Sequence, residues 1–205
     1  MRRTTLILAT TALMLAPLSA LAKTRGFDST ITAPVTTAVK IEVVLSDDLA
    51  HRADNLPDDI RRRGAGASSL RSGFASNGFY GDKALQRLLE EVEEELTDDL
   101  TKRGVALSDD APVILRVVLE DVKNNRPTFE QMSREPSLSF DSFGVGGAEL
   151  SAALIDDTGS ELGTMTYRWF ESSLQNAPFI RGTATWTDAK RAISRFSRHT
   201  AKELS

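Results

Sequence analysis

The segment AELSAALIDDTGSELGTMTYRWFE, residues 148–171, predicts a β-hairpin. In each arm, residues 148–155 and residues 161–171, apolar side chains recur at alternate positions, which is typical of a strand with one buried face. The turn between them is Asp156-Asp157-Thr158-Gly159, and it suits a hairpin because aspartate tolerates turn conformations and glycine supplies positive φ. The paired aspartates do not indicate a calcium loop, which needs several more oxygen ligands at defined spacing.

Two further strands and two helices are expected outside the hairpin. Residues 38–45 (AVKIEVVL) and residues 113–122 (VILRVVLEDV) alternate in the same way and predict strands. Apolar residues at helical spacing predict an amphipathic helix that begins at Asp82, a suitable N-cap, and ends near Arg103. A second amphipathic helix, with a buried stripe and a basic face, is expected from Thr187 to the end of the chain.

The order strand, helix, strand, strand, strand, helix predicts one α+β domain over residues 38–205. We expect two layers: a mostly antiparallel four-stranded sheet, and two helices packed on one of its faces. The other face is mixed, and solvent, a partner or the connection 123–145 could cover it. The connection 46–81 is expected to be a solvated loop with one short helix near residues 58–63 at most. The connection 123–145 is longer than most structureless loops, which indicates function or disorder.

The first residues have the pattern of a secretory signal peptide, expected to span residues 1–22. A basic start precedes the uncharged apolar run Leu6–Ala16, and small residues stand at Ala20 and Ala22, so cleavage is expected before Lys23. The run is shorter than the roughly 20 apolar residues that a membrane helix needs, which argues against an uncleaved anchor. A lipoprotein would have cysteine where Lys23 stands, so we expect an unlipidated periplasmic protein with no transmembrane segment.

Residues 23–37 are polar and are expected to form a flexible or extended lead-in. Loss of the signal peptide removes two arginines, so the formal net charge falls from −4 to −6. Such an acidic chain is a poor candidate for nucleic-acid binding or for unaided adhesion to anionic lipid. The chain has no cysteine, which excludes disulfides, thiol catalysis and thiolate metal sites.

No pattern in the sequence predicts an active site, a cofactor site or a metal site. The two histidines, His51 and His199, stand apart from any metal-binding spacing and are interpreted as ordinary surface or boundary residues. The glycine-rich stretch Gly144-Val145-Gly146-Gly147 lacks the lysine of a phosphate-binding loop and opens a strand, so a permissive turn or bulge is expected. We therefore expect a protein that is not an enzyme.

The part of the chain from residue 38 onward resembles a loose group of Gram-negative envelope proteins and lipoproteins. The shared features are a helix that ends L-x-x-R-G at Leu100–Gly104, the glycine-rich strand start Phe143–Gly147, the hairpin Leu154–Leu162 and a final amphipathic helix. That group is similar to the small α+β domains of outer-membrane assembly and secretion accessories. Many of its members carry a lipobox, which this chain lacks. The resemblance implies a fold and a compartment but no catalytic residues.

Two functions are compatible with the export signal and the expected α+β fold. The first is a non-enzymatic periplasmic interaction module, accessory to envelope assembly or transport, that contacts an envelope protein through Phe129, Met132, Phe140 and Phe143. Aromatic residues and methionine are enriched in interface cores. These side chains could equally fold back over their own sheet. The second function is binding of a small ligand or lipid between the sheet and one of the long connections.

Overall fold

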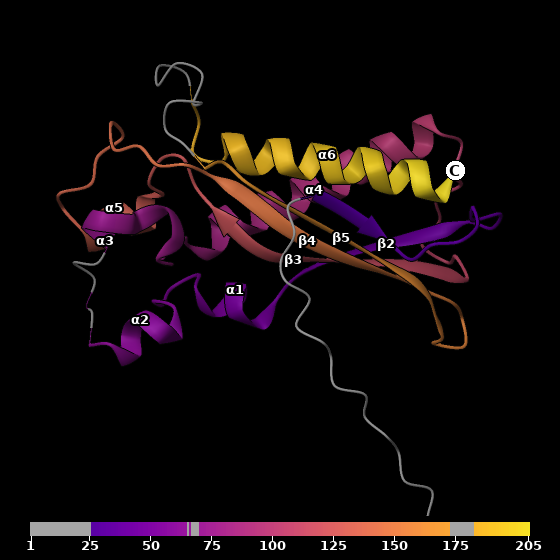
Figure 1. Ribbon diagram of the computed structural model, residues 1–205, viewed down its shortest axis with the longest axis horizontal. Coiled ribbons are helices and arrows are strands. Elements are labelled where there is room, and N and C mark those ends of the chain that lie inside the picture. The colour runs from indigo at the N-terminus through magenta and orange to yellow at the C-terminus, as the bar shows by residue number, and fades with distance from the viewer. Residues whose placement is uncertain (1–25, 65, 67–69, 173–182) are drawn as a thin grey trace, which may run out of the picture.

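The computed structural model describes residues 26–64, 66, 70–172 and 183–205. The predicted signal peptide, residues 1–22, and its cleavage residues Ala20, Ala22 and Lys23 lie outside these ranges. Two long helices lie side by side over one face of a single twisted sheet, and the short helices gather toward the end of the sheet that is away from the C-terminus (Figure 1). The predicted α+β class is confirmed, although the structure has short helices besides the two long ones that were expected.

The sheet has five strands in the order β1-β5-β4-β3-β2, whose bounds are β1 Gly26–Ser29, β2 Val39–Leu45, β3 Val113–Lys123, β4 Gly147–Ile155 and β5 Glu161–Phe170. All four strands that alternation predicted are present. The hairpin β4–β5 is antiparallel, with Leu150 opposite Tyr167, and Gly159 adopts a φ of 83° in its turn. β3 is antiparallel to β4, so the three central strands form a meander.

The sheet differs from the expected one in two respects. It has a fifth strand, because residues 26–29 of the expected lead-in pair antiparallel with β5, from Gly26 opposite Arg168 to Ser29 opposite Met165. This strand is too short and too polar to show alternation. In addition, β2 and β3 pair in parallel, because the helix between them returns the chain to the edge from which β2 began.

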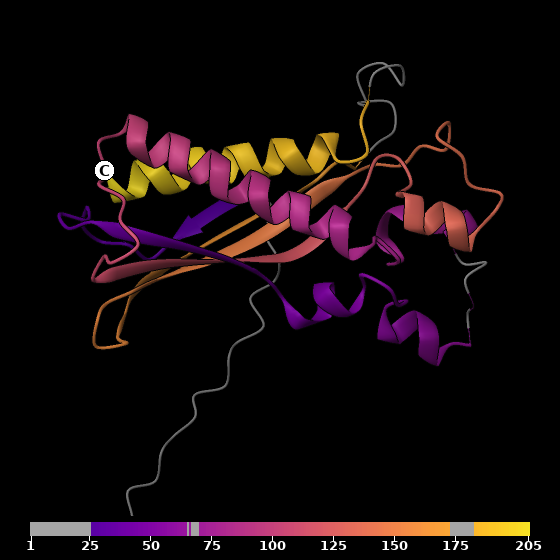
Figure 2. The ribbon, with the colours of Figure 1, turned by 180° about the vertical axis from the view of Figure 1, so that it is seen from behind.

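The helical layer consists of α4, Asp82–Lys102, and α6, Thr187–Leu204 (Figure 2). Both helices bury one apolar stripe, as their spacing predicted. The core between the helices and the sheet is filled by large side chains with almost no exposed surface, among them Leu88, Leu96, Leu150, Met165 and Phe196. Ser197 of α6 donates to the backbone oxygen of Glu95 on α4 at 2.7 Å, which fixes the two helices against each other. Among the described helices, none is long and apolar enough to span a bilayer.

The two long connections are largely structured. The first contains α1 Asp47–His51, α2 Asp58–Arg62, α3 Leu70–Gly73 and the short 3₁₀ helix η2 Phe74–Ser76, and the second contains α5 Phe129–Arg134. The short helix expected near residues 58–63 is therefore α2. The connection 123–145 does not cover the mixed sheet face; it builds the end of the molecule around α5, where Leu70, Phe74 and Leu138 form a small core of their own.

Candidate functional site

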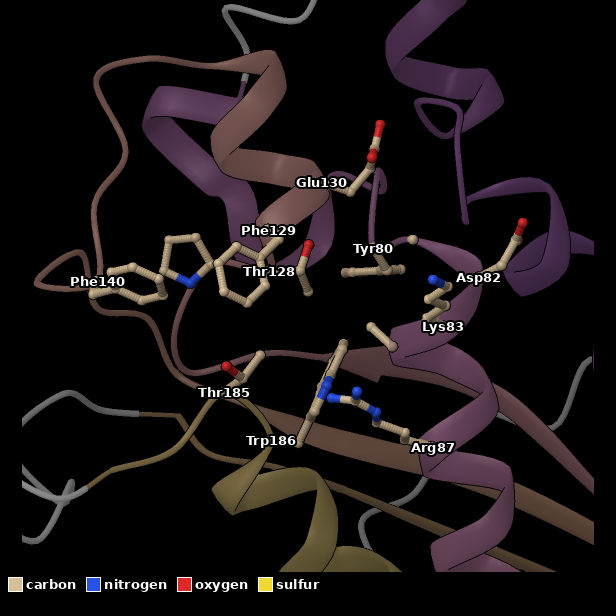
Figure 3. A pocket seen from close by; sticks show the side chains of 13 residues that line it. Tyr80, Asp82, Lys83, Arg87, Thr128, Phe129, Glu130, Phe140, Thr185 and Trp186 are labelled. Atoms are coloured by element: carbon tan, nitrogen blue, oxygen red, sulfur yellow. The ribbon is translucent and has the colours of Figure 1, made fainter.

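A cavity of about 480 Å³ lies where the first turns of α4, α5 and α6 meet (Figure 3). Its walls come from four separate parts of the chain, and the lining residues are Tyr80, Gly81, Asp82, Lys83, Ala84, Arg87, Pro127, Thr128, Phe129, Glu130, Phe140, Thr185 and Trp186. The volume falls within the range of about 300–1,000 Å³ that is usual for ligand pockets. This cavity is the candidate functional site.

Two exposed phenylalanines form one wall of the cavity. Phe129 is the first residue of α5 and Phe140 follows that helix in the same connection; their rings meet edge to face with centroids 5.5 Å apart. Phe129 is 79% exposed and Phe140 is 62% exposed, the two highest values among the large apolar side chains of the described residues. Edge-to-face pairs of this kind are stabilising, so the two rings present a single preformed aromatic surface.

Two buried aromatic residues form the inner part of the cavity. The rings of Tyr80 and Trp186 meet edge to face, with their centroids 5.7 Å apart. Tyr80 stands two residues before α4, and Trp186 stands directly before α6. The hydroxyl of Tyr80 lies 2.9 Å from the backbone oxygen of Val122, to which it can donate. Behind Tyr80, the guanidinium of Arg52 lies 5.9 Å from the ring centroid and contacts Asp121 at 2.8 Å. The inner part of the site is therefore held in place by polar contacts on the side away from the cavity.

Burial raises the pKa of Tyr80 well above its ordinary value of 10.0, and Asp121 acts in the same direction while Arg52 opposes it. Above about pH 10 the unfolded chain loses this proton and the folded chain keeps it, so stability falls as pH rises. We expect this one group to lower the free energy of unfolding by at most about 1.4 kcal/mol per pH unit above pH 10. Urea denaturation at pH 9 and pH 11 measures the fall, and Tyr80→Phe should make it shallower. An equally steep fall in the variant would contradict the assignment.

A buried glutamine holds α5, and thus Phe129, against the rest of the molecule. Gln131 has no exposed surface; its Nε2 donates to the backbone oxygens of Phe74 at 2.7 Å and Gly78 at 2.9 Å. Its Oε1 accepts from Asn124 Nδ2 at 2.6 Å and from the backbone nitrogen of Thr128 at 3.0 Å. Two hydrogen bonds make a capping box at the start of α5. The backbone nitrogen of Thr128 donates to Gln131 Oε1, and the backbone nitrogen of Gln131 donates to Thr128 Oγ1.

A second buried polar cluster fixes the start of α6. Asn125 Nδ2 donates to Asp188 Oδ2 at 2.6 Å, and the backbone nitrogen of Asp188 donates back to Asn125 Oδ1 at 2.8 Å. The backbone nitrogen of Gly146 donates to the same carboxylate oxygen at 3.1 Å. A side chain at Gly146 would lie 2.8 Å from Asn125 Oδ1, so the close approach requires glycine. The glycine-rich stretch, which was expected to form a permissive turn or bulge, thus allows close packing at the start of β4.

The structure separates the four residues that were predicted to bind a partner. Phe129 and Phe140 lie together at the cavity, whereas Met132 is half-buried against the small core of Leu70, Phe74 and Leu138. Phe143 is half-buried as well, and the guanidinium of Arg126 lies 5.3 Å from its ring centroid. Arg126 also donates to the backbone oxygen of Phe140 at 2.8 Å. Neither Met132 nor Phe143 lines the cavity.

Charged side chains from α4 and α5 line the cavity beside the aromatic residues. Lys83 and Arg87 are exposed and lie one turn apart on α4; Figure 3 shows the guanidinium of Arg87 beside Trp186, while the amine of Lys83 lies nearer to Tyr80. Asp82 points away from these two side chains, and Glu130 is paired with Arg134 at 2.9 Å. The site thus joins an aromatic surface to two cations.

The two histidines take no part in this site. His51 is half-buried with its Nε2 3.8 Å from Asp58, and His199 stacks on Phe27 with centroids 4.9 Å apart. Across the described ranges, no three side chains from histidine, cysteine, aspartate and glutamate gather in a way that could hold a metal ion. The geometry of the cavity suits recognition of apolar and anionic groups.

Sequence reasoning did not assign Tyr80, Lys83 or Arg87 to a site, and it placed Trp186 only in the buried stripe of the last helix. No local motif joins these residues, because α4, α5 and α6 lie far apart in the sequence. One signal could have pointed to the site: an aromatic residue stands just before the first turn of each long helix, at Tyr80 and Trp186.

No family model matches the sequence, and no curated protein matches it. Among solved structures, the chain is similar to the PelC dodecamer from Paraburkholderia phytofirmans and to a point variant of that protein. Both are 10% identical to this chain, and both matches cover 87% of this chain and 95% of the other; the TM-scores are 0.44 and 0.43. So remote a likeness assigns neither a family nor a function.

Proposed function

We propose that the protein is a non-enzymatic periplasmic interaction module, accessory to envelope assembly or transport, whose contact surface is the aromatic pair Phe129–Phe140. The exposure of this pair, at 79% and 62%, is the observation that supports the proposal. Large apolar side chains that stay exposed side by side mark interaction sites in soluble proteins. Burying such rings against a partner is favourable by about 25 cal/mol for each Å² removed from water.

The rigidity of the surroundings also supports this function. Arg126 holds the backbone at Phe140, and Gln131 holds the helix that begins at Phe129. A preformed contact surface loses little conformational entropy when it binds, so more of the contact energy remains as affinity. Exposed aromatic anchors on a rigid support are typical of interface hot spots.

Site-specific crosslinking in the native host tests the proposal. A photoreactive residue at position 140 is expected to capture one discrete envelope protein, and Phe129→Ala in the same chain should reduce that capture several-fold, because it removes the neighbouring ring. Leu162, which is 49% exposed in the hairpin, offers a matched control position with a similar apolar side chain. A photoreactive residue at the control position should not capture the protein that position 140 captures.

Recovery of only uncrosslinked monomer from position 140 would contradict the interaction module. The cavity volume of about 480 Å³ would then favour the second candidate, a periplasmic small-ligand or lipid-binding protein. Native mass spectrometry of protein from its host distinguishes the two, since a bound small molecule adds a small defined mass to the chain, whereas a protein partner adds the mass of a whole polypeptide.

A further inference from the structure

We infer that the cavity receives an acidic peptide segment of the partner, in which an apolar side chain packs against Phe129 and Phe140 while an adjacent carboxylate pairs with Lys83 and Arg87. The inference rests on the proposed function and specifies the chemistry of the partner. It follows from the charge of the lining and from the arrangement of cations beside aromatic rings.

The two cations of the lining have no ion-pair partner among the described residues. This distinguishes them from cations nearby: Arg134 pairs with Glu130 at 2.9 Å, and Arg191 pairs with Asp188 at 3.2 Å. Lys83 and Arg87 are four residues apart on α4, so their side chains project from the same face of the helix. Two cations on one face can share a single carboxylate.

The acidic residues of the lining do not neutralise these cations. Glu130 is paired with Arg134, and the carboxylate of Asp82 is directed away from the side chains of Lys83 and Arg87 (Figure 3). The positive end of the α4 dipole lies at the same place, since the helix begins at Asp82 and no side chain caps it. A carboxylate placed there meets favourable charge from several directions.

The ligand is inferred to be a peptide because the other candidates fit less well. An anionic membrane surface would be repelled by the mature chain, whose expected net charge is −6. An uncharged lipid would leave Lys83 and Arg87 without a counter-charge. An apolar side chain next to a carboxylate, as in the sequence Phe-Glu, satisfies both parts of the site.

Titration with a defined probe tests this inference. The chain has two tryptophans, so the indole Nε1–H signals of Trp186 and Trp169 report on the cavity and on the sheet separately. Acetyl-Gly-Phe-Glu-Gly-amide should shift the Trp186 signal and leave the Trp169 signal unchanged. It should bind about fivefold more tightly than the peptide with glutamine in place of glutamate. At about 0.5 M salt the difference should largely disappear.

Charge reversal provides the decisive variant. The double change Lys83→Glu and Arg87→Glu should abolish the preference for the acidic peptide and create one for acetyl-Gly-Phe-Lys-Gly-amide. A matched control is Arg198→Glu with Lys202→Glu, which reverses one arginine and one lysine at the same spacing on exposed positions of α6. The control should bind the acidic peptide as the unmodified chain does. Both pairs are exposed, so neither variant should impair folding.

Three results would overturn the inference: equal binding of the glutamate and glutamine peptides, an unchanged preference after the reversal at Lys83 and Arg87, or a larger Trp186 shift with phosphatidylglycerol vesicles than with either peptide. These results are separable from failure of the proposed function. If position 140 still captures its partner in the charge-reversed chain, the interaction module stands and the acidic chemistry of the partner falls.

Discussion

Replacing Asp188 with alanine is expected to lower the free energy of unfolding by about 3 kcal/mol, because the change leaves buried donors without an acceptor. Asp188 is 5% exposed, and its carboxylate accepts from Asn125 Nδ2 at 2.6 Å and from the backbone nitrogen of Gly146 at 3.1 Å. Both donors lie in the interior and cannot turn to solvent. Urea denaturation followed by circular dichroism measures the loss.

Asp188→Asn gives the graded comparison. Its side-chain oxygen can still accept from Asn125 and Gly146, so only the pairing with the half-exposed Arg191 is lost, and the expected cost is about 1 kcal/mol. Asp98→Ala on the exposed face of α4 serves as the control for loss of a carboxylate, and it should change stability by less than about 0.5 kcal/mol. If Asp188→Ala were no more damaging than Asp98→Ala, the buried cluster would not hold the start of α6.

Most of the fold could be predicted from the sequence, because burial of one face of each strand or helix makes apolar residues recur at regular intervals. The strands β3, β4 and β5 each present one face to the helices, and α4 and α6 each bury one stripe, so the apolar residues repeat every two or every three to four positions. The strand β1 lacks such a repeat. Its four residues, GFDS, are held by backbone pairing with β5. Because backbone hydrogen bonds do not depend on the side chains, the sequence of β1 does not reveal this pairing.

The parallel pairing of β2 with β3 could have been anticipated. Two strands separated by a long helix can lie next to each other in parallel, whereas antiparallel neighbours are usually joined by short turns. The long connection that holds α4 is such a sign. The antiparallel signal of the β4–β5 hairpin applies only to strands that a short turn joins, and β2 and β3 are not joined in that way.

Composition singled out four apolar residues of one connection as a contact surface, and the structure brings two of them, Phe129 and Phe140, together at the cavity. Composition could not separate them from Met132 and Phe143, which are also apolar but are half-buried. Which side of a short irregular segment faces solvent depends on contacts with distant residues. The polar residues that set those contacts, such as Gln131, have no distinguishing sequence pattern.

Gln131→Leu is expected to be among the most damaging single changes in the chain, with a loss of about 4 kcal/mol in the free energy of unfolding. The leucine has a similar volume but no polar atoms, so the backbone oxygens of Phe74 and Gly78 and the side-chain amide of Asn124 lose a partner inside the protein. The backbone nitrogen of Thr128 loses its acceptor too, which removes half of the capping box at α5. Urea denaturation measures the loss.

Gln86→Leu is the matched control, because Gln86 is an exposed glutamine on a helix, and the same change there should alter stability by less than about 0.5 kcal/mol. The two variants separate the cost of losing an amide from the cost of leaving its buried partners unsatisfied. Gln131 also sets the position of Phe129, two residues earlier on the same helix. Under conditions where the Gln131→Leu protein remains folded, capture of a partner from position 140 should therefore fall together with stability. A variant that lost stability but kept full capture would show that the aromatic pair does not need a rigid support.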